Sequence, residues 1–86
     1  MRKIASLYGQ AADSLAASPA PTAYIWYRDG LIGNYREAAD IATGYSYLND
    51  LSSQSAFDAL YTRWQARVGD LSKLQARLKT QQSRSP

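Results

Sequence analysis

The residues best suited to recognise a partner form two groups that combine cations with aromatic rings. The first predicted group has the Tyr, Trp and Arg composition that dominates hot spots of protein interfaces, and consists of Trp26, Tyr27, Arg28, Arg36 and Tyr47. The second predicted group falls along one edge of a helical pattern and consists of Arg63, Arg67, Lys73 and Arg77. Four cations on one edge could follow acidic protein surface or a phosphate backbone. Both groups predict recognition through noncovalent contacts.

Catalytic chemistry has few residues to draw on. The 86-residue chain contains no Cys, no His and a single Glu, Glu37. General acid and base catalysis usually uses His or a carboxyl group of raised pKa, and the Ser residues have no evident base. Without Cys and His the usual ligand sets for zinc, copper and iron cannot be assembled. We therefore predict a protein that is not an enzyme and that has no metal site and no cofactor.

The net charge of +3 is unevenly distributed. Residues 1–62 hold four basic and six acidic residues and carry −2, whereas residues 63–86 hold six basic and one acidic residue and carry +5. The C-terminal quarter should therefore seek acidic surface. Asp70 interrupts the basic row, a pattern that is also typical of a solvated helix face.

The spacing of apolar residues predicts an all-α fold, a small bundle of three main helices at about 2–17, 34–51 and 55–79. The prolines of residues 18–21 end the first helix. Asn34, three residues before Glu37, has the spacing of a capping residue for the second helix. Ser55 is the predicted cap of the third helix. The expected organisation is a single helical domain over 1–86, with a flexible tail at 80–86.

Residues 22–33 allow two interpretations. A short extra helix over 22–30 would be capped by Thr22 and end at Gly30. The alternative is an α+β fold with a β-hairpin at 23–33 that turns at Asp29 and Gly30, a favoured dipeptide for such turns. A hairpin without a third strand is weak, so the helix is the preferred interpretation.

The third helix carries the longest apolar stripe. A helix over 56–79 would be roughly 36 Å long, more than the width of a compact domain of this size, so its far end should protrude or pack on another surface. Phe57, Trp64, Leu71 and Leu78 repeat every seven residues, and Arg67 takes an inner position between them. A homodimer through this C-terminal helix is therefore an alternative mode of association.

The ten Tyr, Trp and Phe residues exceed what so small a core can enclose. We therefore expect a small non-enzymatic protein-binding module, an adaptor or an inhibitor and regulator of a larger assembly, of the kind common among accessory proteins of phages and plasmids. The alternative is a nucleic-acid-binding protein that uses the basic C-terminal helix. The apolar residues near the N-terminus are interrupted by Gln10 and Asp13, and no run is long enough to span a membrane, so we expect a cytoplasmic protein without membrane contact.

Overall fold

The computed structural model describes residues 2–84 and confirms the all-α prediction. Its helices are α1 (Arg2–Ala17), the short 3-10 helix η1 (Thr22–Tyr24), α2 (Ile25–Ser46) and α3 (Gln54–Arg84). Residues 2–84 contain no strand, so the hairpin alternative is wrong. None of the helices in this part of the chain combines the length and the apolar character needed to cross a membrane.

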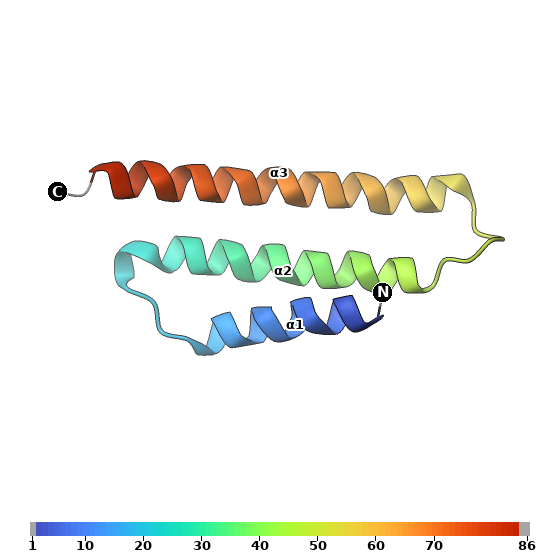
Figure 1. Cartoon of the computed structure of the whole chain (residues 1–86), viewed down its shortest axis with the longest axis horizontal. Coiled ribbons are helices and arrows are strands. Elements are labelled where there is room, and N and C mark those ends of the chain that lie inside the picture. Colours follow the sequence, from blue (N-terminus) through green and yellow to red (C-terminus); the bar gives the residue numbers. More distant parts are fainter. Residues whose placement is uncertain (1, 85–86) are drawn as a thin grey trace.

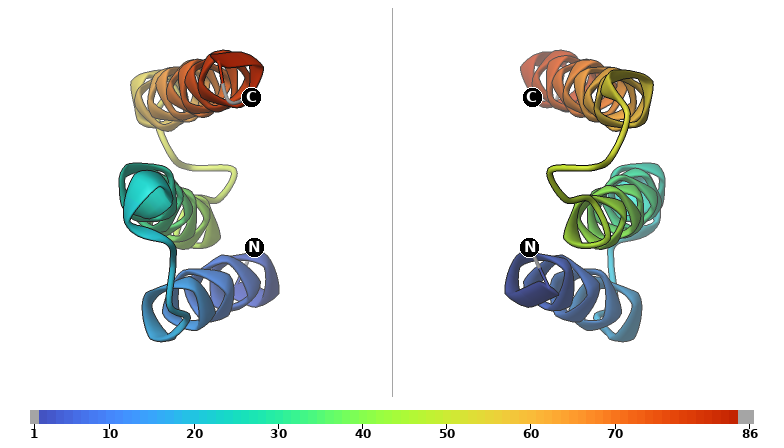
Figure 2. Two further views of the ribbon diagram at one scale, coloured as in Figure 1. Left: turned by 90° about the vertical axis from the view of Figure 1, so that its left-hand side faces the viewer. Right: turned by 90° about the vertical axis from the view of Figure 1, so that its right-hand side faces the viewer.

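The three long helices lie side by side, with α2 between α1 and α3 (Figure 1). The end-on views show the same order, so the helices form a thin layer (Figure 2). The Cα atoms extend over 56 × 24 × 13 Å, and their radius of gyration is 15.5 Å. A compact domain of this length has a radius of gyration of about 12 Å. The chain is therefore elongated and flat, with two broad faces.

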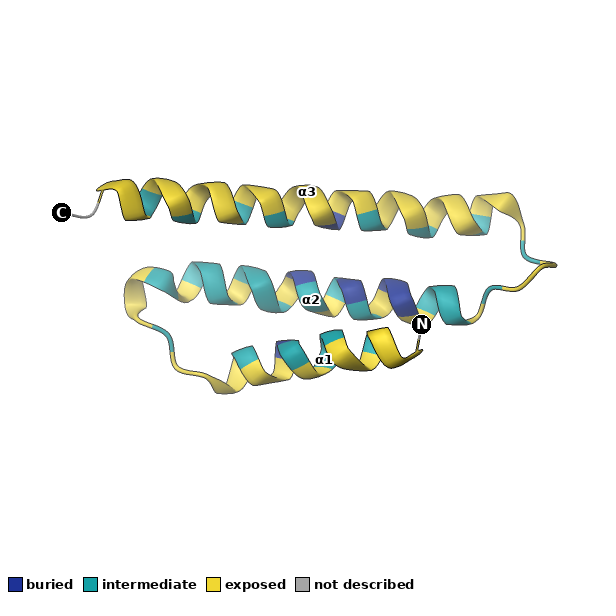
Figure 3. Cartoon of the chain, in the orientation of Figure 1, coloured by how far each residue is buried: buried dark blue, intermediate teal, exposed yellow. Residues whose placement is uncertain are grey.

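Small side chains form the centre of the layer. The fully or almost fully buried apolar residues come from α1 and α2, and they are Ala12, Ala38, Ile41 and Ala42 (Figure 3). Ile41 is the one large side chain among the described residues that is completely enclosed. Alanine lets two helices approach closely but hides little apolar surface per residue. The core is consequently narrow, and most large side chains keep some contact with solvent.

The first helix ends where the sequence predicts, but the second helix differs. Residues 25–46 form one uninterrupted helix, so the expected break at Gly30 and the expected cap at Asn34 are both wrong. The helix also ends at Ser46, before the predicted end at residue 51. Asn34 is instead buried in the middle of α2, where its Nδ2 donates to the carbonyl oxygen of Arg67 at 2.8 Å. Contacts between helices explain this difference, because they hold in helical form a segment whose glycines favour a turn.

Two glycines of α2 provide the space for α3. A Cβ atom on Gly30 would lie 2.6 and 2.9 Å from the two methyl groups of Leu74, and one on Gly44 would lie 2.8 Å from a methyl group of Leu60. The glycines are fourteen residues apart, as are the leucines, which is close to four turns of an α-helix. The paired order shows that α2 and α3 run antiparallel, with leucine side chains filling the positions that the glycines leave open.

The third helix begins one residue after Ser53, whose Oγ accepts a hydrogen bond from the amide of Ala56 at 3.3 Å. Ser53 therefore caps α3, and the predicted cap at Ser55 is wrong. The helix contains 31 residues and ends at Arg84, which gives a length of about 46 Å. Residues 80–84 of the predicted tail are helical in the structure. Residues 85 and 86 lie outside the described part of the chain.

Candidate protein-binding face

Trp26, the central residue of the first predicted group, is held by contacts within the chain. Its Nε1 donates to the carbonyl oxygen of Ala23 and to Oε1 of Gln81, each at 2.9 Å. The Cζ atom of Arg77 lies 3.9 Å from the centroid of the Trp26 ring, and Tyr27 meets this ring edge-on at 5.7 Å. Trp26 thus connects the start of α2 to the end of α3.

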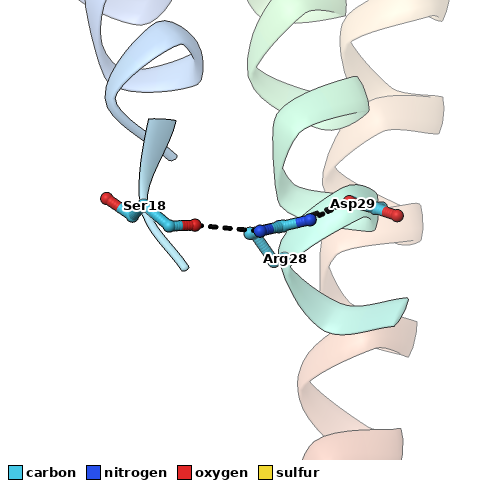
Figure 4. Close-up of polar contacts among 3 residues, drawn as sticks. All are labelled: Ser18, Arg28 and Asp29. Carbon is cyan, nitrogen blue, oxygen red and sulfur yellow. Dashed lines mark hydrogen bonds and ion pairs between the residues drawn. The ribbon is translucent and has the colours of Figure 1, made fainter. Parts of the chain in front are cut away.

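Arg28 also makes contacts inside the chain. Its Nη1 donates to the carbonyl oxygen of Ser18 at 2.8 Å, and its guanidinium contacts the carboxylate of Asp29 at 3.4 Å (Figure 4). The hydrogen bond ties the segment after α1 to the first turns of α2. Arg28 therefore helps to fix the connection between these two helices.

The remaining members of the first predicted group lie further along α2. Arg36 is exposed, and Tyr47, which is 72% exposed, is the C-cap residue of the helix. Tyr47 follows Trp26 by 21 residues, so the two are separated by roughly 30 Å along the helix axis. The structure therefore does not bring Trp26 and Tyr47 together in one patch.

The basic row of α3 is not a continuous line of free cations. Arg63 forms an ion pair with Glu37 of α2, and Arg77 lies over the Trp26 ring. Lys73 is exposed, whereas Arg67 is buried. Arg63, Lys73 and Arg77 line a groove between α2 and α3 together with the acidic residues Asp29, Glu37 and Asp70. Charges of both signs are therefore mixed on this side of the layer.

A different surface combines aromatic rings with three of the exposed apolar side chains, and we call it the aromatic face. Two adjoining grooves define it, and their walls come from all three long helices: Ile4, Leu7, Tyr8, Ala11, Tyr35, Ala42, Tyr45, Tyr61, Trp64, Arg67 and Leu71. Leu7 and Tyr61 are each 56% exposed, and Ile4 is also exposed. The apolar stripe of α1 and the ring-rich flank of α3 therefore meet on one side of the layer.

Tyr8 occupies the centre of this face. Its ring centroid lies 5.9 Å from that of Tyr35 on α2 and 6.2 Å from that of Trp64 on α3, where the two rings meet edge-on. Edge-to-face and tilted arrangements at such distances are favourable for aromatic rings. Tyr8 thus links α1 to α3 across α2.

Arg67 lies beneath these rings. The residue is 6% exposed, and its Cζ atom lies 4.9 Å from the Tyr8 centroid and 4.5 Å from the Trp64 centroid. Its Nε donates a long hydrogen bond, 3.4 Å, to the carbonyl oxygen of Asn34. The inner position of Arg67 in the α3 repeat could be read from the sequence. The contribution of α1 to its surroundings could not, because no local pattern pairs Tyr8 with Arg67.

The chemistry available on this surface is recognition through ring surface, aliphatic surface and one guanidinium. Within residues 2–84, no group of three or more acidic side chains is placed to hold a metal ion. Comparisons with protein-family models, curated proteins and solved structures found no match to this chain. The function is therefore argued from the geometry of the aromatic face.

Proposed function

We propose that this chain is a protein-binding module, an adaptor or an inhibitor of a larger assembly, and that it docks through the aromatic face. The observation that carries the proposal is a pair of adjoining grooves in which exposed apolar side chains surround aromatic rings contributed by all three long helices. The exposed residues Leu7, Tyr61 and Ile4 line these grooves together with the rings of Tyr8 and Trp64. Tyr and Trp are the residues that most often anchor protein interfaces.

The surface area supports the same proposal. The solvent-accessible surface of the chain is 6029 Å². A folded monomer of 9.5 kDa is expected to expose about 5,000 Å². The excess of about 1,000 Å² is similar to the ~800 Å² that each partner contributes to a standard protein interface. Docking of one partner would bring the exposed area per residue to that of a compact protein.

Capture from the native host followed by calorimetry on the purified complex tests the proposal. We expect a stoichiometric complex with wild-type protein and its loss in a double variant, Leu7→Ser with Tyr61→Ser. Tyr47→Ser is the matched control, because Tyr47 is more exposed than either residue but lies outside the two grooves. Equal affinity in the double variant and the wild type would refute docking on the aromatic face. Loss of binding in Tyr47→Ser but not in the double variant would place the binding site at the C-terminal end of α2.

Nucleic-acid binding is the alternative function, and the +5 charge of residues 63–86 is the observation that favours it. Contacts to phosphates would make the affinity fall with salt at a slope close to the number of contacts. Lys73→Gln and Arg84→Gln would lower that slope, since both side chains are exposed on α3. We rank this function second because Arg63 is paired with Glu37 and Arg67 is buried. Absence of any complex with DNA or RNA at low salt would exclude it.

A further inference from the structure

Arg67 is a buried cation that lacks an anionic partner among the described residues. A guanidinium has five N–H donors, and the hydrogen bond to the Asn34 carbonyl oxygen uses the one on Nε. In residues 2–84, no carboxylate lies within ion-pair distance of the two terminal nitrogens. The rings of Tyr8 and Trp64 offer cation–π contacts, which recover only part of the cost of removing a cation from water.

Asn34, which contacts Arg67 and lines the groove between α2 and α3, adds a second unsatisfied group. Its Nδ2 donates to the carbonyl oxygen of Arg67, but its buried Oδ1 has no hydrogen-bond partner. Buried polar atoms are almost always hydrogen-bonded in folded proteins, so an unpaired one calls for an explanation. The contact between Asn34 and Arg67 therefore leaves N–H donors and one acceptor oxygen unused.

The surroundings of Arg67 define the group that could pair with it. Its guanidinium is a planar fork that matches the two oxygens of a carboxylate. Arg67 borders two grooves, and the one between α2 and α3 already contains the carboxylates of Asp29, Glu37 and Asp70. The groove that Arg67 shares with Tyr8 has otherwise apolar or aromatic walls, which are Ile4, Leu7, Ala11, Tyr35 and Leu71. A ligand that fits this groove must therefore combine apolar surface, which packs on these walls, with a carboxylate, which pairs with the Arg67 guanidinium.

The shape of the face favours a helix as the carrier of that carboxylate. Both α1 and α3 run antiparallel to α2, so they lie parallel to each other on either side of the grooves (Figure 1). The α3 wall from Tyr61 to Leu71 is about 15 Å long, which corresponds to roughly three turns of helix. An amphipathic helix laid in a groove contacts it through residues at positions i, i+3 or i+4, and i+7.

We propose that the aromatic face binds an amphipathic helix of a partner protein, and that an aspartate or glutamate set between large apolar residues of this helix pairs with Arg67. The inference rests on the proposed function and specifies the chemistry of the partner. The bound helix would lie over Tyr8, between α1 and α3, and turn the three-helix layer into a four-helix arrangement. The carboxylate would form two parallel hydrogen bonds in surroundings that exclude water, where charge-assisted hydrogen bonds are strong.

A second copy of the chain fits this requirement less well. Three of its helical carboxylates already have partners within the chain, in the contacts Asp29–Arg28, Glu37–Arg63 and Asp58–Gln54. Three carboxylates remain on the long helices: Asp13 has only glycine, glutamine and alanine at helical spacing, Asp40 has Arg36, Glu37, Thr43 and Gly44, and the neighbours of Asp70 include Lys73. The occupant that matches the groove is therefore a helix of a different protein.

The test is a selection of helical peptides on the folded protein. A library of fourteen-residue helices with one randomised face is displayed on phage and selected against the wild type and, in parallel, against Arg67→Met. We expect wild-type selection to enrich one acidic residue between two large apolar residues, and selection on Arg67→Met to enrich apolar residues without the acid. The best peptide should bind Arg67→Met at least about 30-fold more weakly than wild type, the lower range for truncation of a buried charge pair.

A second version of the test changes the peptide and leaves the protein unchanged. Replacing its acidic residue by the matching amide should weaken binding to wild type by a similar factor and leave binding to Arg67→Met unchanged. Arg67→Met itself should keep the helical circular dichroism of wild type and unfold at a midpoint no lower than that of wild type, because replacing buried charged groups by apolar side chains is often neutral or stabilising. Lost affinity without loss of stability is a result that a purely structural role of Arg67 would not give.

Three outcomes would overturn the inference. Enriched peptides without an acidic residue, or equal affinity for wild type and Arg67→Met, would leave the aromatic face as a docking surface but remove the carboxylate pairing. A wild-type dimer in sedimentation equilibrium that becomes monomeric in Leu7→Ser would assign the face to a second copy. Failure to enrich any helix on the wild type would reject a helical occupant, and the capture experiment with the aromatic-face variants would then decide separately whether the face binds another protein.

Discussion

Replacing each of two glycines of α2 by alanine should change stability in opposite directions. Alanine is a better helix former than glycine by about 1 kcal/mol in a helix interior. A Cβ atom on Gly33 has no heavy atom within 4 Å, so Gly33→Ala should stabilise the fold by nearly that amount. A Cβ atom on Gly30 would lie 2.6 and 2.9 Å from the two Leu74 methyl groups, so this side chain must move or the helices must separate.

The expected difference follows from these two contributions. Overpacking a close contact costs about 1–3 kcal/mol, which offsets the gain in helix propensity and makes Gly30→Ala neutral to destabilising by ~2 kcal/mol. The propensity contribution is common to both variants, so the difference between Gly33→Ala and Gly30→Ala, about 1–3 kcal/mol, measures the steric cost. In a domain of this size each kcal/mol corresponds to a shift of about 4–8 °C in Tm.

Urea and thermal unfolding followed by far-UV circular dichroism would measure these changes. The double variant Gly30→Ala with Leu74→Val is the control, because the shorter side chain should recover part of the loss if the clash is its cause. Equal stabilisation by Gly33→Ala and Gly30→Ala would refute the close approach of α2 and α3. A loss in Gly30→Ala that Leu74→Val does not relieve would show that the cost arises elsewhere in the helix.

Two further predictions concern the ends of the helices. Trp26→Phe keeps an aromatic ring, although a smaller one, but removes the indole N–H that reaches Ala23 and Gln81, and should cost at least about 1 kcal/mol in urea unfolding; an unchanged midpoint would show that these two hydrogen bonds contribute nothing. Ser53→Ala should destabilise the protein by about 1 kcal/mol through loss of the α3 cap, whereas Ser55→Ala should be neutral or slightly stabilising; the reverse order in thermal unfolding would contradict the observed start of α3.

The sequence predicts the elements that have strong periodicity and clear ends. The first helix has its predicted bounds because a narrow apolar stripe is followed by two prolines. The predicted break inside α2 is wrong, because the usual preference of glycine for turns takes no account of packing against a neighbouring helix. Gly30 and Gly44 lie opposite leucines of α3, and such contacts between distant parts of the chain leave no local signature.

The composition of the aromatic face could be predicted from the sequence, but its position could not. The count of aromatic residues correctly indicates that rings remain outside the core, since none of the described Tyr, Trp or Phe residues is fully buried. Trp26 and Arg28 have the residue types of an interface but serve contacts within the chain. The aromatic face depends instead on how α1 is placed against α3, because Tyr8 and Trp64 meet only after the helices associate.

The central place of α2 has a consequence for amide hydrogen exchange. Because α2 has a neighbouring helix on each side, its amides should exchange most slowly, and those of α1 should exchange earlier. Detachment of α1 would break the ring contacts of Tyr8 but leave the glycine–leucine contacts of the α2–α3 hairpin in place. A partner that binds over Tyr8 would hold α1 against the other two helices, so its binding should slow exchange throughout α1 as well as at the contact itself.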